Sequence, residues 1–160
     1  MEDNAEKSNL VSITSNLISN ADKDLLISLE GFLSQYKRSK QIQNIPLKLF
    51  SSPKLGVLEV IVKYLKENTP LTYSDIVKLL NRDQRTIWTT YSKAIKKHKE
   101  PFRISSDDEF ISISAFSDMN YSPLQVLINE LERKGNSLKQ IARLTNRSYK
   151  NIWMTKKRNE

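Results

Sequence analysis

Hydrophobic positions recur at helical spacing in two stretches of the chain that resemble each other. In the first stretch the spacing predicts a helix over about residues 54–67, which Pro70 prevents from continuing. The buried face of that helix is predicted to consist of Leu55, Leu58, Ile61, Val62 and Leu65. The equivalent helix of the second stretch carries Leu124, Val126 and Leu131.

A short second helix follows in both stretches. Thr72 and Asp75 fit a capping box, in which the Thr hydroxyl accepts from the Asp75 amide and the carboxylate reaches back to Thr72. Ser137 and Gln140 stand at the same place in the second stretch. The buried face of this helix is predicted to carry Ile76, Leu79 and Leu80 in the first stretch, and Ile141 and Leu144 in the second.

A turn and a third helix complete the pattern. The second helix ends at Asn81 or Asn146, and Asn is the residue that best replaces Gly where the chain turns through left-handed φ. Asp83 or Ser148 then provides a good N-cap for a third helix. Its buried side is predicted to begin with Ile87 or Ile152 and, in the first stretch, to continue with Tyr91 and Ala94. This order is the sequence form of a helix-turn-helix.

The two stretches are copies of one unit. Residues 45–50 align with residues 111–116 at an offset of 66, and a deletion before the second helix changes the offset to 65. The shared Asn-Arg and Ile-Trp pairs fall in one register, which chance matching does not explain. The sequence therefore predicts an all-α chain with two tandem three-helix helix-turn-helix units. We call them repeat 1 (residues 45–98) and repeat 2 (residues 111–160), with a linker at 99–110 that has a short extended stretch near residues 102–104.

The beginning of the chain has a different pattern. Residues 1–8 are polar and are predicted to form a disordered tail, while residues 9–40 are predicted to form a helical segment that Asn20-Ala21-Asp22 divides. Apolar residues follow the a/d spacing of a helix that packs on a partner, at Ile18, Leu25, Leu29, Phe32 and Tyr36. Three roles stay open for this segment, namely docking on repeat 1, homodimerisation, and docking on another protein.

Residues 71–94 resemble the promoter-reading region four of bacterial sigma factors and the related LuxR-type helix-turn-helix. The likeness is carried by the opening Leu-Thr-Tyr, the Asp-Ile of the second helix, the turn, the Thr-Ile that opens the third helix and the Lys-Ala near its end. Repeat 2 matches more loosely. Repeat 1 is also similar to tandem helix-turn-helix proteins of archaea, through its motif Leu-Leu-Asn-Arg-x-x-Arg-Thr-Ile-Trp-Thr. The resemblance implies base-reading positions at Gln84, Arg85 and Thr89.

The chain departs from the pattern of these families at the turn. Asn replaces the usual Gly in both repeats, and Arg82 or Arg147 replaces the usual buried aliphatic residue. Because an unpaired buried charge is costly, each arginine is expected to reach solvent, a carboxylate, a nearby Trp face or a phosphate.

Charge strengthens the prediction of a nucleic-acid partner. The net charge is +8 and the pI is about 9.6. Residues 78–97 hold six Lys or Arg against one Asp, and residues 139–158 hold seven against no acidic residue. Residues 99–136 have a net charge of −3. The positive charge is thus concentrated at the same place in each repeat, which favours double-stranded DNA as the partner.

A helix-turn-helix places the exposed face of its third helix in the major groove. The residues expected to contact bases are Gln84, Arg85, Thr86, Thr89 and Lys93 in repeat 1, and Tyr149, Lys150 and Met154 in repeat 2. The residues expected to contact phosphates are Thr72, Lys78, Arg82, Lys96, Lys97, Lys139, Arg143, Arg147, Lys156, Lys157 and Arg158. Repeat 1 is therefore expected to discriminate sequence, and repeat 2 to contribute more through charge. Trp88 and Trp153 stand beside buried isoleucines, which favours packing or a contact between repeats over base stacking.

Composition excludes several other classes of function. The chain has three Gly and no Cys, which argues against a phosphate-binding glycine loop and excludes cysteine metal sites. His98 has no His or Cys partner, and the carboxylates do not cluster as a catalytic site would require, so neither an enzyme nor a metal or other cofactor is expected. The chain is expected to be cytoplasmic and nucleoid-associated. Two alternatives to a transcriptional regulator stay open, an adaptor that docks on RNA polymerase and a nonspecific architectural DNA-binding protein.

Overall fold

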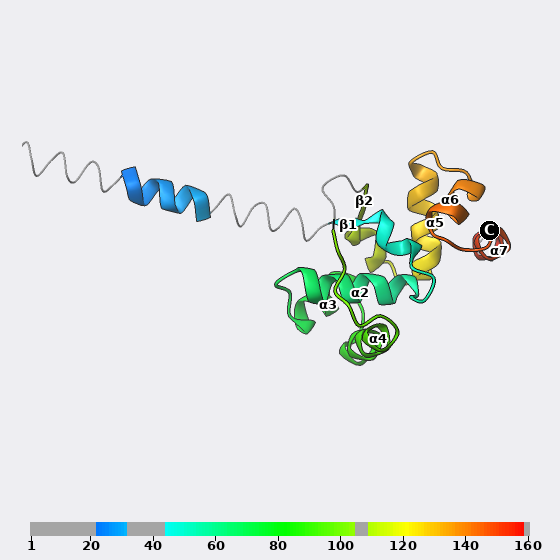
Figure 1. Cartoon of the computed structure of the whole chain (residues 1–160), viewed down its shortest axis with the longest axis horizontal. Coiled ribbons are helices and arrows are strands. Elements are labelled where there is room, and N and C mark those ends of the chain that lie inside the picture. The colour runs from blue at the N-terminus through cyan, green and yellow to red at the C-terminus, as the bar shows by residue number, and fades with distance from the viewer. Residues whose placement is uncertain (1–21, 32–43, 105–108, 159–160) are drawn as a thin grey trace, which may run out of the picture. The chain divides into compact units, whose positions relative to one another are not determined.

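The computed structural model describes residues 22–31, 44–104 and 109–158. The chain divides into two compact parts, residues 1–40 and residues 41–160, and each is described by itself (Figure 1). In the first part the described residues 22–31 form a helix whose residues are all exposed. The predictions for residues 1–8, for the break at Asn20-Ala21 and for the a/d positions Ile18, Phe32 and Tyr36 lie outside the described residues.

The second part, which we call the body, contains the two repeats as the same series of elements. Each repeat begins one residue earlier than predicted. Repeat 1 consists of strand β1 (Asn44–Pro46), the 3-10 helix η1 (Leu47–Ser51) and helices α2 (Val57–Asn68), α3 (Tyr73–Leu80) and α4 (Gln84–Lys97). Repeat 2 consists of strand β2 (Phe110–Ser112), the 3-10 helix η2 (Ile113–Ser117) and helices α5 (Pro123–Arg133), α6 (Leu138–Leu144) and α7 (Tyr149–Lys157). The internal similarity of the sequence thus extends to the order of the elements.

The body is mostly helical but not all-α, because β1 and β2 pair as a small antiparallel sheet. Ile45 lies opposite Ile111, and both are fully buried. The extended stretch expected near residues 102–104 has no regular secondary structure, and the strand begins only at Phe110. Each strand has only three residues, which is too short for an alternation of apolar and polar residues to be recognised in the sequence. Each strand also forms only by pairing with the strand of the other repeat.

The first helix of repeat 1 begins later than its hydrophobic pattern indicates. Gly56 is the N-cap, with extended backbone at φ −70° and ψ 159°, so that the helix starts at Val57. The Glu59 carboxylate accepts a hydrogen bond from the Gly56 amide at 2.8 Å, which satisfies one of the free N–H groups at this end. Leu55 is nevertheless buried, with 2% of its surface exposed.

The predicted caps and turns of the second and third helices are confirmed. Thr72 Oγ1 accepts from the Asp75 amide and the Asp75 carboxylate accepts from the Thr72 amide, while Ser137 and Gln140 form the equivalent box. Asn81 and Asn146 are both in the left-handed region at φ 50°, and they are the non-glycine residues with positive φ in the described chain. The N-caps of α4 and α7 are Asp83 and Ser148.

One continuous core serves both repeats. Phe50 of η1 stacks on Phe116 of η2 with the ring centroids 6.1 Å apart. Equivalent residues of the helices are buried together, including Val60 and Val126, Leu65 and Leu131, Ile76 and Ile141, and Ile87 and Ile152.

One predicted core residue of repeat 2 is exposed. Leu144, which was expected on the buried face of α6, has 37% of its surface exposed. Its counterpart Leu79 is half-buried, and the fully buried position is the next one, which Leu80 occupies in repeat 1 and Thr145 in repeat 2. The Thr145 hydroxyl donates to the Ile141 carbonyl oxygen at 2.7 Å, so this polar group is satisfied inside the core.

Candidate nucleic-acid interface

Helix α4 has a buried side and a polar exposed side. Ile87 and Ala94 are fully buried and hold the helix on α2 and α3. Gln84, Arg85, Lys93 and Lys96 are exposed, and Thr89 is half-buried. Among the described residues, no acidic side chain forms an ion pair with Arg85, Lys93 or Lys96. These cations are therefore available to an anionic ligand.

Thr86 was expected to contact a base, but its amide and hydroxyl groups both form hydrogen bonds within the protein. Its amide donates to Asp83 Oδ1 at 2.8 Å and its hydroxyl donates to Asp83 Oδ2 at 2.5 Å. These hydrogen bonds, the one from the Thr86 hydroxyl first, hold the pKa of the Asp83 carboxyl below its ordinary value. The Thr86 hydroxyl thus stabilises the start of α4.

The two tryptophans are exposed, and the expectation that they pack is wrong. Trp88 has 58% of its surface exposed and Trp153, at the same position of α7, has 43%. Trp88 follows Arg85 by three residues, a spacing that places both side chains on one helical face. That spacing could have identified Trp88 as part of the exposed face. The adjacent buried isoleucine misled the prediction, although neighbouring residues on a helix point in different directions.

Helix α7 presents a face of different chemistry. Tyr149, Trp153 and Met154 have between 43% and 48% of their surfaces exposed, and Lys150 is exposed as well. The ammonium group of Lys157 lies 5.6 Å from the centroid of the Trp153 ring. Ile152 alone is buried in this helix. The base-reading candidates of repeat 2 are therefore accessible, but they offer mainly aromatic and apolar groups.

The expected phosphate contacts fall into two groups. The residues of the first group are exposed and form no ion pair with an acidic side chain in the described chain; they are Lys78, Lys96, Lys139, Arg143, Lys157 and Arg158. Lys97 instead pairs with Glu59 at 2.7 Å, and Lys156 pairs with Glu132 at 2.6 Å. The Thr72 hydroxyl is engaged by Asp75 in the capping box.

The turn arginines lie half inside the body. Arg147 Nη2 donates to the Leu55 carbonyl oxygen of repeat 1 at 3.1 Å, and burial lowers the pKa of its guanidinium. The Nε atoms of Arg82 and Arg147 are both buried, and neither has a hydrogen-bond partner among the residues that the structure describes. A backbone carbonyl of the other repeat was not among the destinations expected for Arg147. This contact between repeats is invisible in the sequence because the two residues are 92 positions apart.

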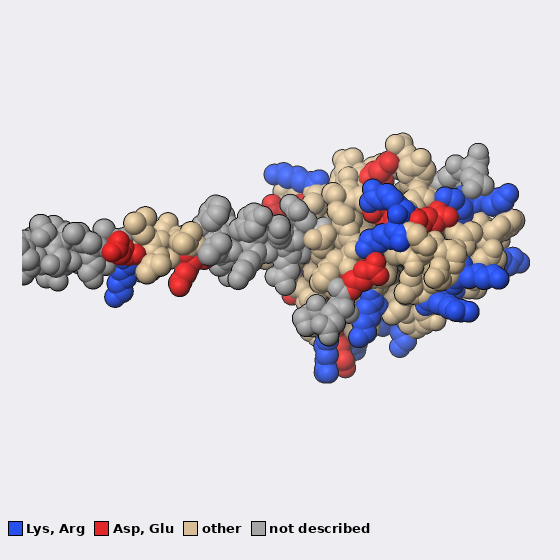
Figure 2. Space-filling view, turned by 90° about the horizontal axis from the view of Figure 1, so that it is seen from above, with Lys and Arg blue, Asp and Glu red and all other residues tan. Residues whose placement is uncertain are grey.

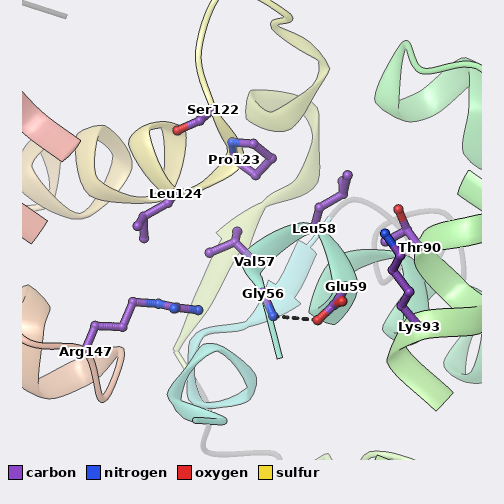
Figure 3. Close-up of a pocket in the computed structure, with 10 residues that line it drawn as sticks. All are labelled: Gly56, Val57, Leu58, Glu59, Thr90, Lys93, Ser122, Pro123, Leu124 and Arg147. Carbon is purple, nitrogen blue, oxygen red and sulfur yellow. Dashed lines mark hydrogen bonds between the residues drawn. The ribbon is translucent and has the colours of Figure 1, made fainter. Parts of the chain in front are cut away.

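An open pocket of about 440 Å³ lies between the two repeats. Figure 3 shows Thr90 and Lys93 of α4 on one side and Arg147, in the turn before α7, on the other. The N-cap and the first residue of α2, Gly56 and Val57, lie between them together with those of α5, Ser122 and Pro123 (Figure 3).

Positive and negative groups are interspersed on one face of the body. Figure 2 shows Lys and Arg side chains projecting from the rim of the body, with Asp and Glu side chains among them on the visible face. The candidate interface is defined by the exposed faces of α4 and α7.

Comparison with known proteins does not place the chain in a family. The chain matches no protein-family model, no curated protein and no solved structure. Within the described ranges, no helix is long and apolar enough to span a bilayer, and no three His, Asp or Glu side chains gather as a metal site would require.

Proposed function

We propose that this chain binds double-stranded DNA in a sequence-dependent manner and regulates transcription. One observation carries the proposal: the third helix of each helix-turn-helix unit exposes its outer face, and Arg85, Lys93 and Lys150 on those faces have no acidic partner among the described residues. An α-helix fits the major groove of B-DNA, where the base edges differ from one another.

Helix α4 provides the discriminating contacts of this proposal. Arg85 can donate both arms of its guanidinium to guanine O6 and N7, and Gln84 can bind adenine N6 and N7. Thr89 and Trp88 extend the same face, and the apolar surface of Trp88 suits a thymine methyl group. Lys93 lies one turn beyond Thr89 and would also contact a base, while Lys96 lies near the end of the helix, where it would contact a phosphate and fix the position of the helix.

The direct test is selection of bound sites from random duplex DNA with the full chain. Arg85→Ala is compared with Arg133→Ala, which removes the same charge from the end of α5, where Arg133 is 73% exposed and pairs with Glu130. The proposal predicts an enriched motif that Arg133→Ala preserves and Arg85→Ala weakens at one or two positions. Selection without any enriched motif would contradict sequence-dependent binding and leave a nonspecific architectural role.

A second candidate function is supported by α7. Its exposed Tyr149, Trp153 and Met154 resemble the aromatic and thioether residues enriched at protein interfaces. Under this alternative the chain is an adaptor that docks on RNA polymerase or another protein. It predicts that the wild-type chain has no measurable affinity for any duplex at physiological salt concentration.

A further inference from the structure

The two repeats meet through equivalent residues. In the sheet, Ile45 lies directly opposite Ile111, its own counterpart at the offset of 66 residues, and Asn44 and Pro46 pair with Ser112 and Phe110. In an antiparallel pair this register places a local two-fold axis between the two isoleucines. The stacked Phe50 and Phe116 are also counterparts, so the same axis passes between their rings.

The helices repeat this relation. η1 of repeat 1 packs against α6 of repeat 2, and η2 of repeat 2 packs against α3, which is the equivalent of α6. α2 packs against its own counterpart α5. Reciprocal contacts of this kind define an isologous interface, the form found between the subunits of a two-fold dimer. The body is therefore a dimer-like arrangement within one chain, although its repeats follow one another head to tail in the sequence.

The axis continues to the surface that carries the third helices. Gly56, Val57 and Leu58 line the open pocket together with their counterparts Ser122, Pro123 and Leu124, so the pocket lies on the axis. Thr90 and Lys93 of α4 border it on one side, and Arg147 before α7 borders it on the other. Figure 1 shows α4 and α7 end-on, with the beginnings of α2 and α5 between them. Both third helices thus flank the axis on one side of the body.

This symmetry has a consequence for the ligand. B-DNA has two-fold axes perpendicular to its length, and a protein with two-fold symmetry matches them by reading two half-sites of opposite orientation. We propose that one chain binds one duplex carrying two half-sites in inverted orientation. The half-sites differ in sequence, because α4 offers Gln84, Arg85 and Thr89 where α7 offers Tyr149, Lys150 and Met154. The inference rests on the proposed function. It adds that the two half-sites are inverted relative to each other and that they differ in sequence.

The first experiment uses the wild-type chain and its selected duplex. The half-site of α4 is the one whose footprint weakens in Arg85→Ala. The other half-site is then reversed in orientation at each of several spacer lengths, and affinity is measured by fluorescence anisotropy. Reversal is expected to weaken binding about tenfold at every spacer length, with one chain bound per duplex. Equal or tighter binding to any reversed duplex would overturn the inference.

The second experiment makes the two faces alike. Tyr149→Gln, Lys150→Arg and Met154→Thr together give α7 the reading residues of α4, at exposed positions that leave the buried Ile152 unchanged. This variant is expected to bind an inverted pair of α4 half-sites about tenfold more tightly than a direct pair. A preference for the direct pair would overturn the inference while sparing the proposed function. Absence of wild-type binding to every duplex would instead overturn the proposed function, and the inference with it.

Discussion

The turn residues are the points where single side chains decide the local fold. Asn81 and Asn146 share φ 50°, a conformation that was predictable because a short helix stops at each of them and a new N-cap follows two residues later. Arg147 was not predictable in the same way. Its carbonyl partner on Leu55 comes from a different repeat, and only the three-dimensional structure brings the two together.

Replacement of the turn asparagines provides a prediction at this scale. Asn81→Ala should lower the free energy of unfolding by roughly 1–2 kcal/mol relative to Asn81→Gly, because a Cβ is unfavourable in left-handed backbone unless the side chain bonds locally. Asn146→Ala and Asn146→Gly should differ by a similar amount. Urea unfolding measures both pairs, and equal values for Ala and Gly would contradict the assigned backbone conformation.

The cap of α4 predicts a dependence of stability on pH. Hydrogen bonds from Thr86 lower the pKa of Asp83 from its ordinary value of 3.8, so the ionised carboxylate stabilises the folded state. This stabilisation is complete above pH 3.8 and is lost as the pH falls through the lower pKa of the folded state. Asp83→Ala should therefore be less stable than wild type at neutral pH, and the difference should shrink in acid.

The matched control for this effect is Ser148, the neutral N-cap at the same position of repeat 2. Ser148→Ala should destabilise the chain equally at neutral and acidic pH, provided that both measurements are made where the wild type is folded. Thermal unfolding as a function of pH checks both variants. A destabilisation by Asp83→Ala that stays constant into acid would show that the charge of Asp83 is not involved.

At the scale of elements, the helices were predictable and the strands were not. Periodic apolar residues and capping boxes are local signals, so they located α2 to α4 and their equivalents to within a few residues. β1 and β2 are three residues each and depend on pairing across the repeats. The sequence identified the residues on the exposed faces of α4 and α7 except Trp88 and Trp153. Both were predicted to pack because each follows a buried isoleucine, although the helical spacing places them on the exposed face.

Adjacent lysines at the end of α4 allow a test of the phosphate contacts. Lys96 is exposed without an acidic partner in the described chain, whereas Lys97 pairs with Glu59 at 2.7 Å. Lys96→Ala should reduce the slope of log K against log salt concentration by about 0.9, the value for one phosphate contact. Lys97→Ala should change the slope less, because part of its charge is already neutralised. Titrations of a duplex at several salt concentrations measure both slopes. If Lys97→Ala changed the slope more than Lys96→Ala, the assignment of the phosphate contact to Lys96 would be wrong.

At the scale of the whole molecule, the sequence predicted the duplication but not the arrangement of its copies. A constant offset establishes which residues are equivalent, and it contains no information about how the copies face each other. Burial of Ile45 against Ile111 and stacking of Phe50 on Phe116 determine that arrangement. The shared core implies that neither repeat buries its apolar surface alone.

This shared core predicts cooperative unfolding of the body. Phe50→Ala should destabilise the folded state by about 3–5 kcal/mol, the cost of removing a buried aromatic ring. Hydrogen exchange should speed up in α5 of repeat 2 as much as in α2 of repeat 1. Phe110→Ala, at a side chain that is 38% exposed in β2, serves as the control with a smaller effect. Faster exchange confined to repeat 1 would mean that the repeats are independent domains.

The most direct test of DNA binding is a titration of the full chain with a selected duplex and a scrambled duplex of the same composition, at several salt concentrations. The selected duplex should bind at least about tenfold more tightly, and Arg85→Ala should abolish most of that preference while leaving the scrambled duplex little affected. If the wild-type chain binds neither duplex at physiological salt concentration, the proposal that α4 and α7 read DNA is wrong.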